Sequence, residues 1–155
     1  MNPTFASAIV QLHPSFEALL AMEPCHPLKV PKSAPQAGIY LLSEGLQHLY
    51  VGRSNRISKR LGNHCRVGAT YKMAAFAFRL ARLETGHLKA SYKPIGSRAD
   101  LMKDPKFRAA FVTAKDRIRH MDVRYVSEPD PLRQALLEVY VAIALRTAHN
   151  DFDTH

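Results

Sequence analysis

The sequence predicts an α+β protein in which three short strands accompany a series of helices. Two runs of aliphatic and aromatic residues lie close together in residues 37–54, and a third run follows at residues 122–127. Apolar residues recur at helical spacing through much of the remaining chain. With 155 residues, the chain is long enough to bury a core without disulfides or a structural metal. We therefore expect one compact domain.

The N-terminal part of the chain precedes the residues that carry chemistry. Residues 4–23 have apolar side chains at roughly helical spacing, which predicts one broken helix or two short ones. Residues 24–35 hold four of the ten prolines, and each proline removes a backbone donor and fixes its own φ. This stretch should be an extended connector. We assign residues 1–35 to a helical extension with its connector, and residues 36–155 to the functional domain.

Residues 37–54, AGIYLLSEGLQHLYVGRS, predict a β-hairpin, because Ser43-Glu44-Gly45 separates two strand-like runs. The pairing would place Tyr40 and Tyr50 on neighbouring strands. Ser54 is a suitable N-cap for a helix over about residues 55–64. That helix and the residue just before it are unusually basic. Its cationic or titratable positions are Arg53, Arg56, Lys59, Arg60 and His64.

The second half of the chain predicts helices at residues 70–84 and 105–120, the strand at 122–127, and a last helix from Pro131 to about Ala148. Asp-Pro pairs supply an N-cap and a first helical residue for the second and third of these helices. We expect Met73 in the core and Lys115 on an outer face. The last helix is apolar nearly all round, so we expect it at the centre of the core.

The charge of the chain points to a polyanionic partner. Twenty-two Lys and Arg against thirteen Asp and Glu leave a formal charge of +9. The N-terminus lacks the basic and apolar regions of a secretory signal, and no apolar run is long enough to span a membrane. Two cysteines are too few for a disulfide framework. We therefore expect a soluble, cytoplasmic protein.

Glu138 is the acidic residue that folding alone explains least. It lies in the apolar tract Leu136-Leu137-Glu138-Val139-Tyr140-Val141. An unpaired buried carboxylate costs several kcal/mol, so Glu138 needs a partner. Two interpretations follow from the residues: an ion pair with one of the 22 basic residues, or a ligand of a metal ion.

Arg60 and His64, four residues apart, lie on one helix face, and Arg56 lies a turn earlier on that face. A guanidinium is a bidentate partner for phosphate, and a histidine near neutral pH can transfer a proton. The alternative interpretation of this stripe is a solvated basic face.

These residues also form a known pattern. Gly38-Ile39-Tyr40, Tyr50-Val51-Gly52 ten residues later, and then Arg60 and His64, with a helical glutamate downstream at Glu138, closely resemble the signature of the GIY-YIG nuclease superfamily. The resemblance covers about residues 37–150. It implies a small three-stranded antiparallel sheet flanked by helices. The spacing between Arg60 and Glu138 is longer than in compact members, and the two predicted helices between them account for the excess.

The resemblance implies roles for individual residues. Tyr40 and Tyr50 would be active-site phenols, Arg60 would bind the phosphate, and Glu138 would hold a divalent metal, Mg²⁺ or Mn²⁺. Either Tyr40 or His64 would act as the general base. Further positions would position or bind the substrate: Gly52, where the chain turns, Asn150, which supports the site, and the backbone-binding cations Arg53, Arg56 and Lys59.

The function implied is metal-dependent hydrolysis of DNA phosphodiester bonds by an endonuclease. Two alternatives remain: a nucleic-acid-binding module without catalysis, and a nuclease acting on RNA. The length leaves little room for an appended recognition domain. Action on structured or flexible DNA, or recruitment by a protein partner, is therefore expected over site-specific cleavage by the chain alone.

Overall fold

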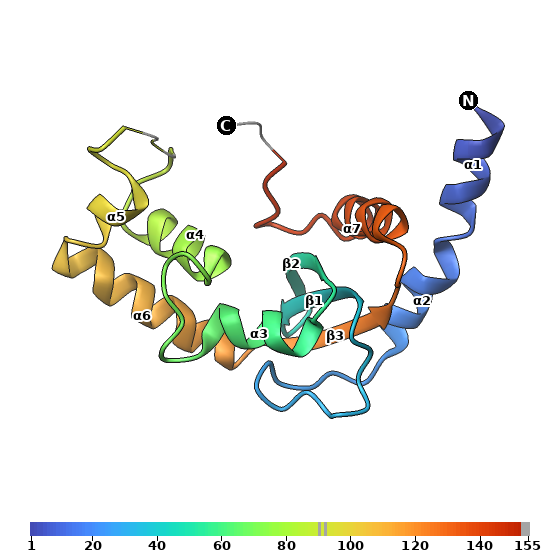
Figure 1. The fold of residues 1–155 in the computed structure, drawn as a ribbon, viewed down its shortest axis with the longest axis horizontal. Helices are drawn as coiled ribbons and strands as arrows, with labels where there is room; N and C mark the ends of the chain where they lie inside the picture. The colour runs from blue at the N-terminus through green and yellow to red at the C-terminus, as the bar shows by residue number, and fades with distance from the viewer. Residues whose placement is uncertain (90, 92, 153–155) are drawn as a thin grey trace. The chain divides into compact units, whose positions relative to one another are not determined.

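A three-stranded antiparallel sheet with helices packed around it forms the framework of the protein (Figure 1). The structure is a computed structural model that describes residues 1–89, 91 and 93–152. The strands are β1 (Gly38–Glu44), β2 (Gln47–Ser54) and β3 (Asp122–Ser127), and their order in the sheet is β2-β1-β3. The expected α+β class and antiparallel sheet are confirmed.

β1 and β2 form the predicted hairpin, with Tyr40 opposite Gly52. The turn lies slightly later than expected. Ser43 and Glu44 belong to β1, and Gly45 begins the turn with a φ of +56°, in the left-handed region that glycine adopts without strain. β3 pairs with the other side of β1. This pairing needs Gly38, because a Cβ there would meet the backbone carbonyl of Val126.

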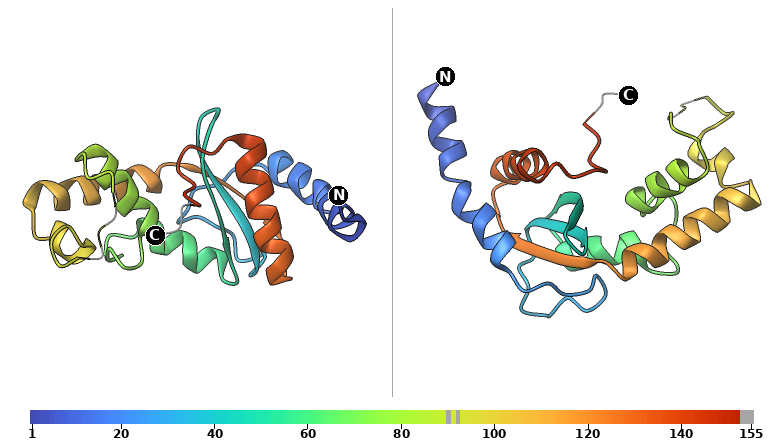
Figure 2. Two further views of the ribbon diagram at one scale, coloured as in Figure 1. Left: turned by 90° about the horizontal axis from the view of Figure 1, so that it is seen from above. Right: turned by 180° about the vertical axis from the view of Figure 1, so that it is seen from behind.

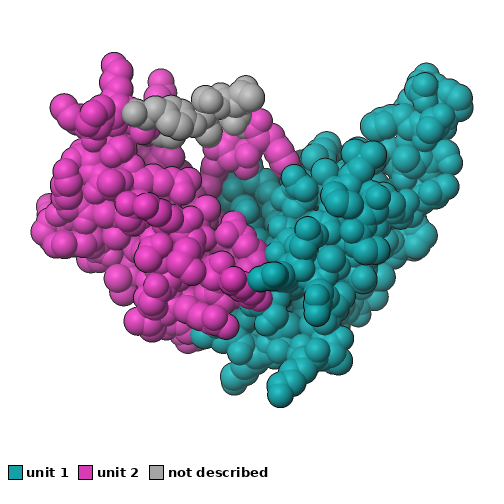
Figure 3. Space-filling model, in the orientation of Figure 1, with its two compact units in different colours: residues 1–58, 121–150 teal, residues 59–120, 151–155 magenta. Residues whose placement is uncertain are grey.

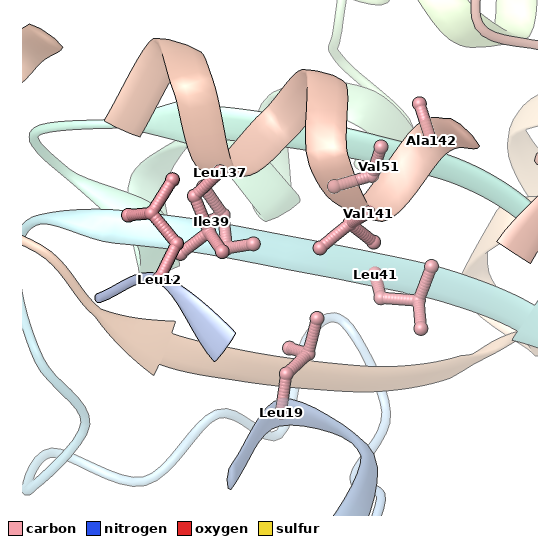
Figure 4. Close-up of a cluster of buried hydrophobic side chains, with 8 residues drawn as sticks. All are labelled: Leu12, Leu19, Ile39, Leu41, Val51, Leu137, Val141 and Ala142. Carbon is pink, nitrogen blue, oxygen red and sulfur yellow. The ribbon is translucent and has the colours of Figure 1, made fainter. Parts of the chain in front are cut away.

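The N-terminal segment contains two short helices, α1 (Pro3–Val10) and α2 (His13–Ala21), as expected. The proline-rich connector that follows joins β3 through one isolated bridge, between Cys25 and Val123. Leu12 and Leu19 are fully buried in the same cluster as side chains of the sheet (Figure 4). The other buried members of that cluster are Ile39, Leu41, Val51, Leu137, Val141 and Ala142. The first 35 residues therefore share a core with the sheet.

The last helix, α7 (Pro131–Leu145), covers one face of the sheet with Leu137 and Val141 (Figure 4). Its N-cap is Asp130, as predicted, whose side chain accepts a hydrogen bond from the backbone of Arg133 at 2.7 Å. The expectation that it lies at the centre of the core is wrong. Leu132 is 69% exposed and Ile143 70% exposed, because only one side of the helix is covered. It also ends earlier than predicted, at Leu145.

The chain divides into two compact units (Figure 3). Unit 1 comprises residues 1–58 and 121–150 and contains the sheet, α1, α2 and α7. Unit 2 comprises residues 59–120 and the C-terminal stretch from Asp151. The division falls within α3 (Ile57–Cys65), which begins in unit 1 and continues into unit 2.

Unit 2 is built on α4 (Ala75–Glu84) and α6 (Pro105–Arg119), which pack against each other, with the short α5 (Arg98–Leu101) between them in the chain (Figure 2). Phe78 lies at the centre of its core, 4.9 Å from Phe107 between ring centroids. α5 follows residues 85–97, of which residues 90 and 92 lie outside the described residues.

Two sequence expectations for unit 2 are wrong. Met73 is 39% exposed, because α4 begins only at Ala75 and the preceding residues form a turn. Lys115 is buried rather than on the outer face. Its ammonium donates hydrogen bonds to the carbonyl oxygens of Val67 at 2.7 Å and Ala69 at 2.9 Å, so the charge has acceptors inside the fold. Among the described residues, no helix is both long and apolar enough to cross a membrane.

Candidate active site

The two tyrosines of the hairpin lie together, as the pairing predicted. Their ring centroids are 6.4 Å apart and the rings are inclined by 42°. Tyr40 is almost fully buried, and its phenol lies against the backbone of Gly52 on the facing strand. A Cβ at position 52 would collide with the Tyr40 hydroxyl and ring. The glycine of the second tripeptide is thus what lets the tyrosine of the first occupy its place.

The alternation of side chains assigns these residues to one face of the sheet. Tyr40 and Gly52 are register partners, and Tyr50 pairs with Leu42, two residues along β1 from Tyr40, so all three project on the same side. Ile39, Leu41 and Val51 have the opposite parity and pack in the cluster beneath α7. Arg53 shares the parity of Val51 and therefore projects on the side that α7 covers.

Tyr125, which the sequence reasoning did not single out, is the register partner of Tyr40 on β3. A cross-strand row thus runs from Gly52 through Tyr40 to Tyr125. Burial, and to a lesser extent the charge of Cys25, raises the pKa of Tyr125, so this phenol stays protonated. The proximity of Tyr125 to Tyr40 follows from the pairing register of β1 and β3, and no local sequence motif predicts it.

Glu138 lies on α7 and forms an ion pair with Arg53. The distance between Arg53 Nε and Glu138 Oε2 is 3.1 Å, with 19% of the glutamate side chain and 47% of the arginine side chain exposed. Burial raises the pKa of the Glu138 carboxyl, while the charge and hydrogen bond of Arg53 lower it. The sequence left two partners open for Glu138, a basic residue or a metal ion. The structure contains the basic residue, Arg53.

The same geometry is compatible with a divalent metal ion. Among the described residues, Oε1 of Glu138 has no hydrogen-bond partner, which leaves one carboxylate oxygen for a hard cation. Magnesium keeps several waters and needs only one or two carboxylates when substrate phosphate completes its shell. No group of three or more His, Cys, Asp or Glu side chains suited to a metal occurs among the described residues. Glu138 would therefore be the main protein ligand.

Asn150 connects the segment after α7 to the outer edge of β2. Its side-chain oxygen accepts from the backbone nitrogen of Val51 at 2.8 Å, and its side-chain nitrogen donates to the Val51 carbonyl at 2.7 Å. The Thr147 hydroxyl donates to the same Asn150 oxygen at 2.8 Å. The amide thus replaces a strand residue at the sheet edge, one residue from Gly52. These bonds engage both the oxygen and the nitrogen of the Asn150 side chain.

Gln134 is a second polar anchor of α7 that the sequence reasoning missed. Its buried amide donates to Asn55 Oδ1 at 3.0 Å and to the Glu128 carbonyl at 2.7 Å. Gln134 ties the first turn of α7 to the residue that follows β2. A glutamine in an apolar helix face is the only signal in the sequence, and it does not name the partner.

Arg60 and His64 lie in unit 2, on consecutive turns of α3. Arg60 Nη1 donates to the carbonyl of Met73 at 3.1 Å. His64 is fully buried and makes an edge contact with Phe76, with ring centroids 6.3 Å apart. Burial, reinforced by the charge of Arg60, lowers the pKa of His64 to about 3. The imidazole is therefore neutral at physiological pH and is a weak proton acceptor.

The three cations assigned to the nucleic-acid backbone are solvent-exposed: Arg53, Arg56 and Lys59. The expectation that Ser54 is the helix N-cap is wrong, because Ser54 is the last residue of β2 and α3 begins only at Ile57. The Ser54 hydroxyl accepts a hydrogen bond from the backbone nitrogen of Arg56 at 2.9 Å. Exposure is what a phosphate contact needs, and it is equally what a solvated basic face shows.

The predicted site residues fall into three groups. In unit 1, the tyrosine pair with Gly52 lies on one side of the sheet, and the Arg53–Glu138 ion pair lies on the side that α7 covers, with Asn150 at the edge of β2. Unit 2 holds Arg60 and His64. No family model, curated protein or solved structure matches the chain.

Proposed function

We propose that this protein is a metal-dependent endonuclease that hydrolyses DNA phosphodiester bonds through a site of the GIY-YIG type. The observation that carries the proposal is the packing of Tyr40 against Gly52, with Tyr50 beside it. The two tripeptides of the motif face each other in the hairpin. Gly52 of the second tripeptide leaves the space that the Tyr40 side chain of the first tripeptide occupies. The charge of +9 supports a polyanionic substrate.

Glu138 is the residue that would hold Mg²⁺ or Mn²⁺, and the ion would supply Lewis-acid stabilisation of the phosphate and the leaving oxygen. Arg60 would neutralise charge on the non-bridging oxygens, an effect typically worth about 3–4 kcal/mol. Of the two candidates for the general base, we favour Tyr40. A buried imidazole with a pKa of about 3 takes a proton poorly near neutrality, which makes His64 the weaker candidate.

A second candidate function is a nucleic-acid-binding module without catalysis. The observation that favours it is the ion pair of Glu138 with Arg53, which satisfies the carboxylate without a metal. The two functions differ in whether bound nucleic acid is cut.

The test is a cleavage panel of supercoiled, single-stranded, flapped and branched DNA together with RNA, each with Mg²⁺, Mn²⁺ or EDTA. We expect nicking of DNA that requires the metal. Glu138→Gln and Arg60→Ala should each reduce the rate by about 100-fold or more, as expected for loss of a group that stabilises the transition state. Binding of DNA in EDTA should change by less than about threefold, because Glu138 acts only when the metal is present and Arg60 acts on charge that builds up in the transition state.

Glu84→Gln provides the matched control, since Glu84 is an exposed glutamate at the end of α4. It should cut like the unmodified protein. Full cleavage by Glu138→Gln with Mg²⁺ would rule out the metal-ligand role. Binding without cutting of any substrate would favour the non-catalytic module, and cutting of RNA alone would reassign the substrate.

A further inference from the structure

Three arginines gather on unit 2, and none of them is among the residues assigned to catalysis. Arg79 and Arg82 are three residues apart and therefore lie on the same face of α4. The guanidinium of Arg98, at the start of α5, lies over the Phe78 ring, 5.3 Å from its centroid. Burial, followed by the charges of Arg79 and Arg98, lowers the pKa of Arg82, so the three cations are close enough to repel one another.

The cluster has more donors than the protein satisfies. Arg82 Nε donates to the carbonyl of His87 at 2.8 Å. Arg79 Nε and Arg82 Nη2 are shielded from solvent, and neither has a hydrogen-bond partner in the part of the chain that the structure describes. A buried donor without an acceptor costs about 1–3 kcal/mol, and more on a charged group. An incoming anion with several oxygens would remove this cost.

One carboxylate already occupies part of the cluster. Asp151 Oδ2 lies 2.6 Å from Arg79 Nη1, with the two side chains 31% and 33% exposed. Asp151 directly follows Asn150, whose amide is fixed to β2. A single carboxylate leaves the inward-facing donors of Arg79 and Arg82 unsatisfied. It also shows that an anionic oxygen fits at the rim.

We propose that Arg79, Arg82 and Arg98 form a binding site for a backbone phosphate of the nucleic acid, and that Asp151 competes with this phosphate for Arg79. The proposal rests on the proposed function for its ligand class. A phosphate presents several acceptors in the fork geometry that guanidinium groups bind, and a carboxylate presents fewer. The cluster is partly exposed rather than enclosed, which suits a phosphate carried on a long polymer.

The first test measures binding of a short fluorescein-labelled DNA duplex by anisotropy, in EDTA so that no cutting occurs. Arg82→Gln should weaken binding by about five- to tenfold and reduce the salt slope by about 1, as expected for the loss of one phosphate contact. Arg108→Gln is the matched control, because Arg108 is an exposed arginine on α6 and loses the same charge. It should weaken binding by less than about twofold. Equal effects of the two variants would overturn the proposal.

The second test reverses the direction of the effect and does not depend on a weakened variant folding well. Asp151→Asn should tighten binding by about three- to fivefold, because the phosphate no longer competes with a carboxylate. Asp116→Asn makes the same change of net charge at an exposed aspartate that pairs with Arg119 at 2.9 Å. It should tighten binding by less than about twofold. An Asp151→Asn variant that binds like Asp116→Asn would count against the competition.

A third arm separates this proposal from the proposed nuclease function. If metal-dependent cutting occurs and depends on Glu138 while Arg82→Gln binds DNA normally, the nuclease stands and the phosphate site fails. If the protein binds no DNA, inorganic pyrophosphate is titrated into the protein and into Arg82→Gln by calorimetry. Binding lost in the variant would reassign the cluster to a small phosphate compound, and no binding in either would overturn the site.

Discussion

The absence of one side chain, at Gly52, decides how the tyrosine pair can pack. The Tyr40 hydroxyl and ring occupy the space that a Cβ would need, and Tyr40 itself is almost fully buried. The Tyr40 side chain cannot move away easily to make room for a Cβ, because β1 is held between two partner strands. The motif glycine is therefore a packing requirement of the hairpin as well as a signature of a family.

Gly52→Ala should destabilise the protein. Insertion of a methyl group into a packed site costs about 1–3 kcal/mol, which corresponds to a fall of about 2–12 °C in Tm for a chain of this size. Gly68→Ala is the control, because nothing lies within 4 Å of a Cβ built there. Thermal melts followed by circular dichroism measure both variants. An unchanged Tm for Gly52→Ala would contradict the close contact.

His64 gives a residue-scale prediction for pH. Its pKa of about 3 in the folded protein lies below the ordinary histidine value of 6.5, so near pH 5 the unfolded chain binds a proton that the folded protein does not. The free energy of unfolding should therefore fall as pH decreases below 6.5. Between pH 7 and pH 5 this one group should remove about 2 kcal/mol of stability.

His64→Gln removes this titration and keeps a neutral polar side chain. Urea unfolding at both pH values should show a smaller loss for the variant, by about 2 kcal/mol, because the other histidines contribute equally to both proteins. Equal losses would mean that His64 is accessible to protons in the folded state. His64 would then remain a candidate general base.

At the scale of the secondary-structure elements, the outer edge of β2 depends on a single side chain. Asn150 fills both backbone hydrogen-bonding groups of Val51, and the backbone nitrogen of His149 donates to the Leu49 carbonyl at 2.9 Å. The segment after α7 thus covers an edge that would otherwise expose its backbone groups.

Asn150→Ala should lower the free energy of unfolding by about 2 kcal/mol, because two backbone groups of β2 lose their partners. Asn63→Ala, on α3, serves as the control and should be neutral or slightly stabilising, since alanine is the better helix former. Urea denaturation gives both values. The amide protons of β2 should also exchange faster in Asn150→Ala, and unchanged exchange would argue against the clamp.

The elements that depend on local signals were predictable from the sequence. Asp104 and Asp130 cap α6 and α7 as expected, and the hairpin register follows from two short runs and a turn. Burial was harder to predict. Lys115 is internal because the Val67 and Ala69 carbonyls happen to face it, a contact between segments more than forty residues apart.

The same difference between local and long-range contacts separates the parts of the candidate site that could be predicted from those that could not. The proximity of Tyr40 and Tyr50 is a local property of the hairpin, so the sequence suffices to predict it. Gly52 was expected where the chain turns, and it lies instead within β2, opposite Tyr40. The partner of Glu138 lies 85 positions away along the chain, and any of 22 basic residues satisfied the same argument. Pairing between residues far apart in the chain is a property of the tertiary structure, and a single sequence does not identify the two partners.

At the scale of the whole molecule, the excess of positive charge belongs to unit 2, whose sequence has fifteen Lys and Arg against six Asp and Glu, whereas unit 1 has seven of each. Arg53 and Arg56 lie in unit 1, whereas Lys59 and the arginine cluster lie in unit 2. A polyanion bound through several such groups releases its counterions, so its affinity must fall with salt. The net charge of +9 thus predicts that the affinity for a polyanion decreases as the salt concentration rises.

If the charge acts in this way, the dissociation constant for a short DNA duplex in EDTA should rise at least tenfold between about 50 and 200 mM NaCl, since even two neutralised phosphates give a slope near −1.8. Anisotropy at four salt concentrations measures the slope. A peptide nucleic acid of the same base sequence is the control, because it has bases but no phosphates, and it should not bind. A dissociation constant that does not change with salt, or equal binding of the uncharged analogue, would mean that the protein recognises something other than the phosphate backbone. Neither the proposed nuclease function nor the proposed phosphate site at the arginine cluster would then have its ligand.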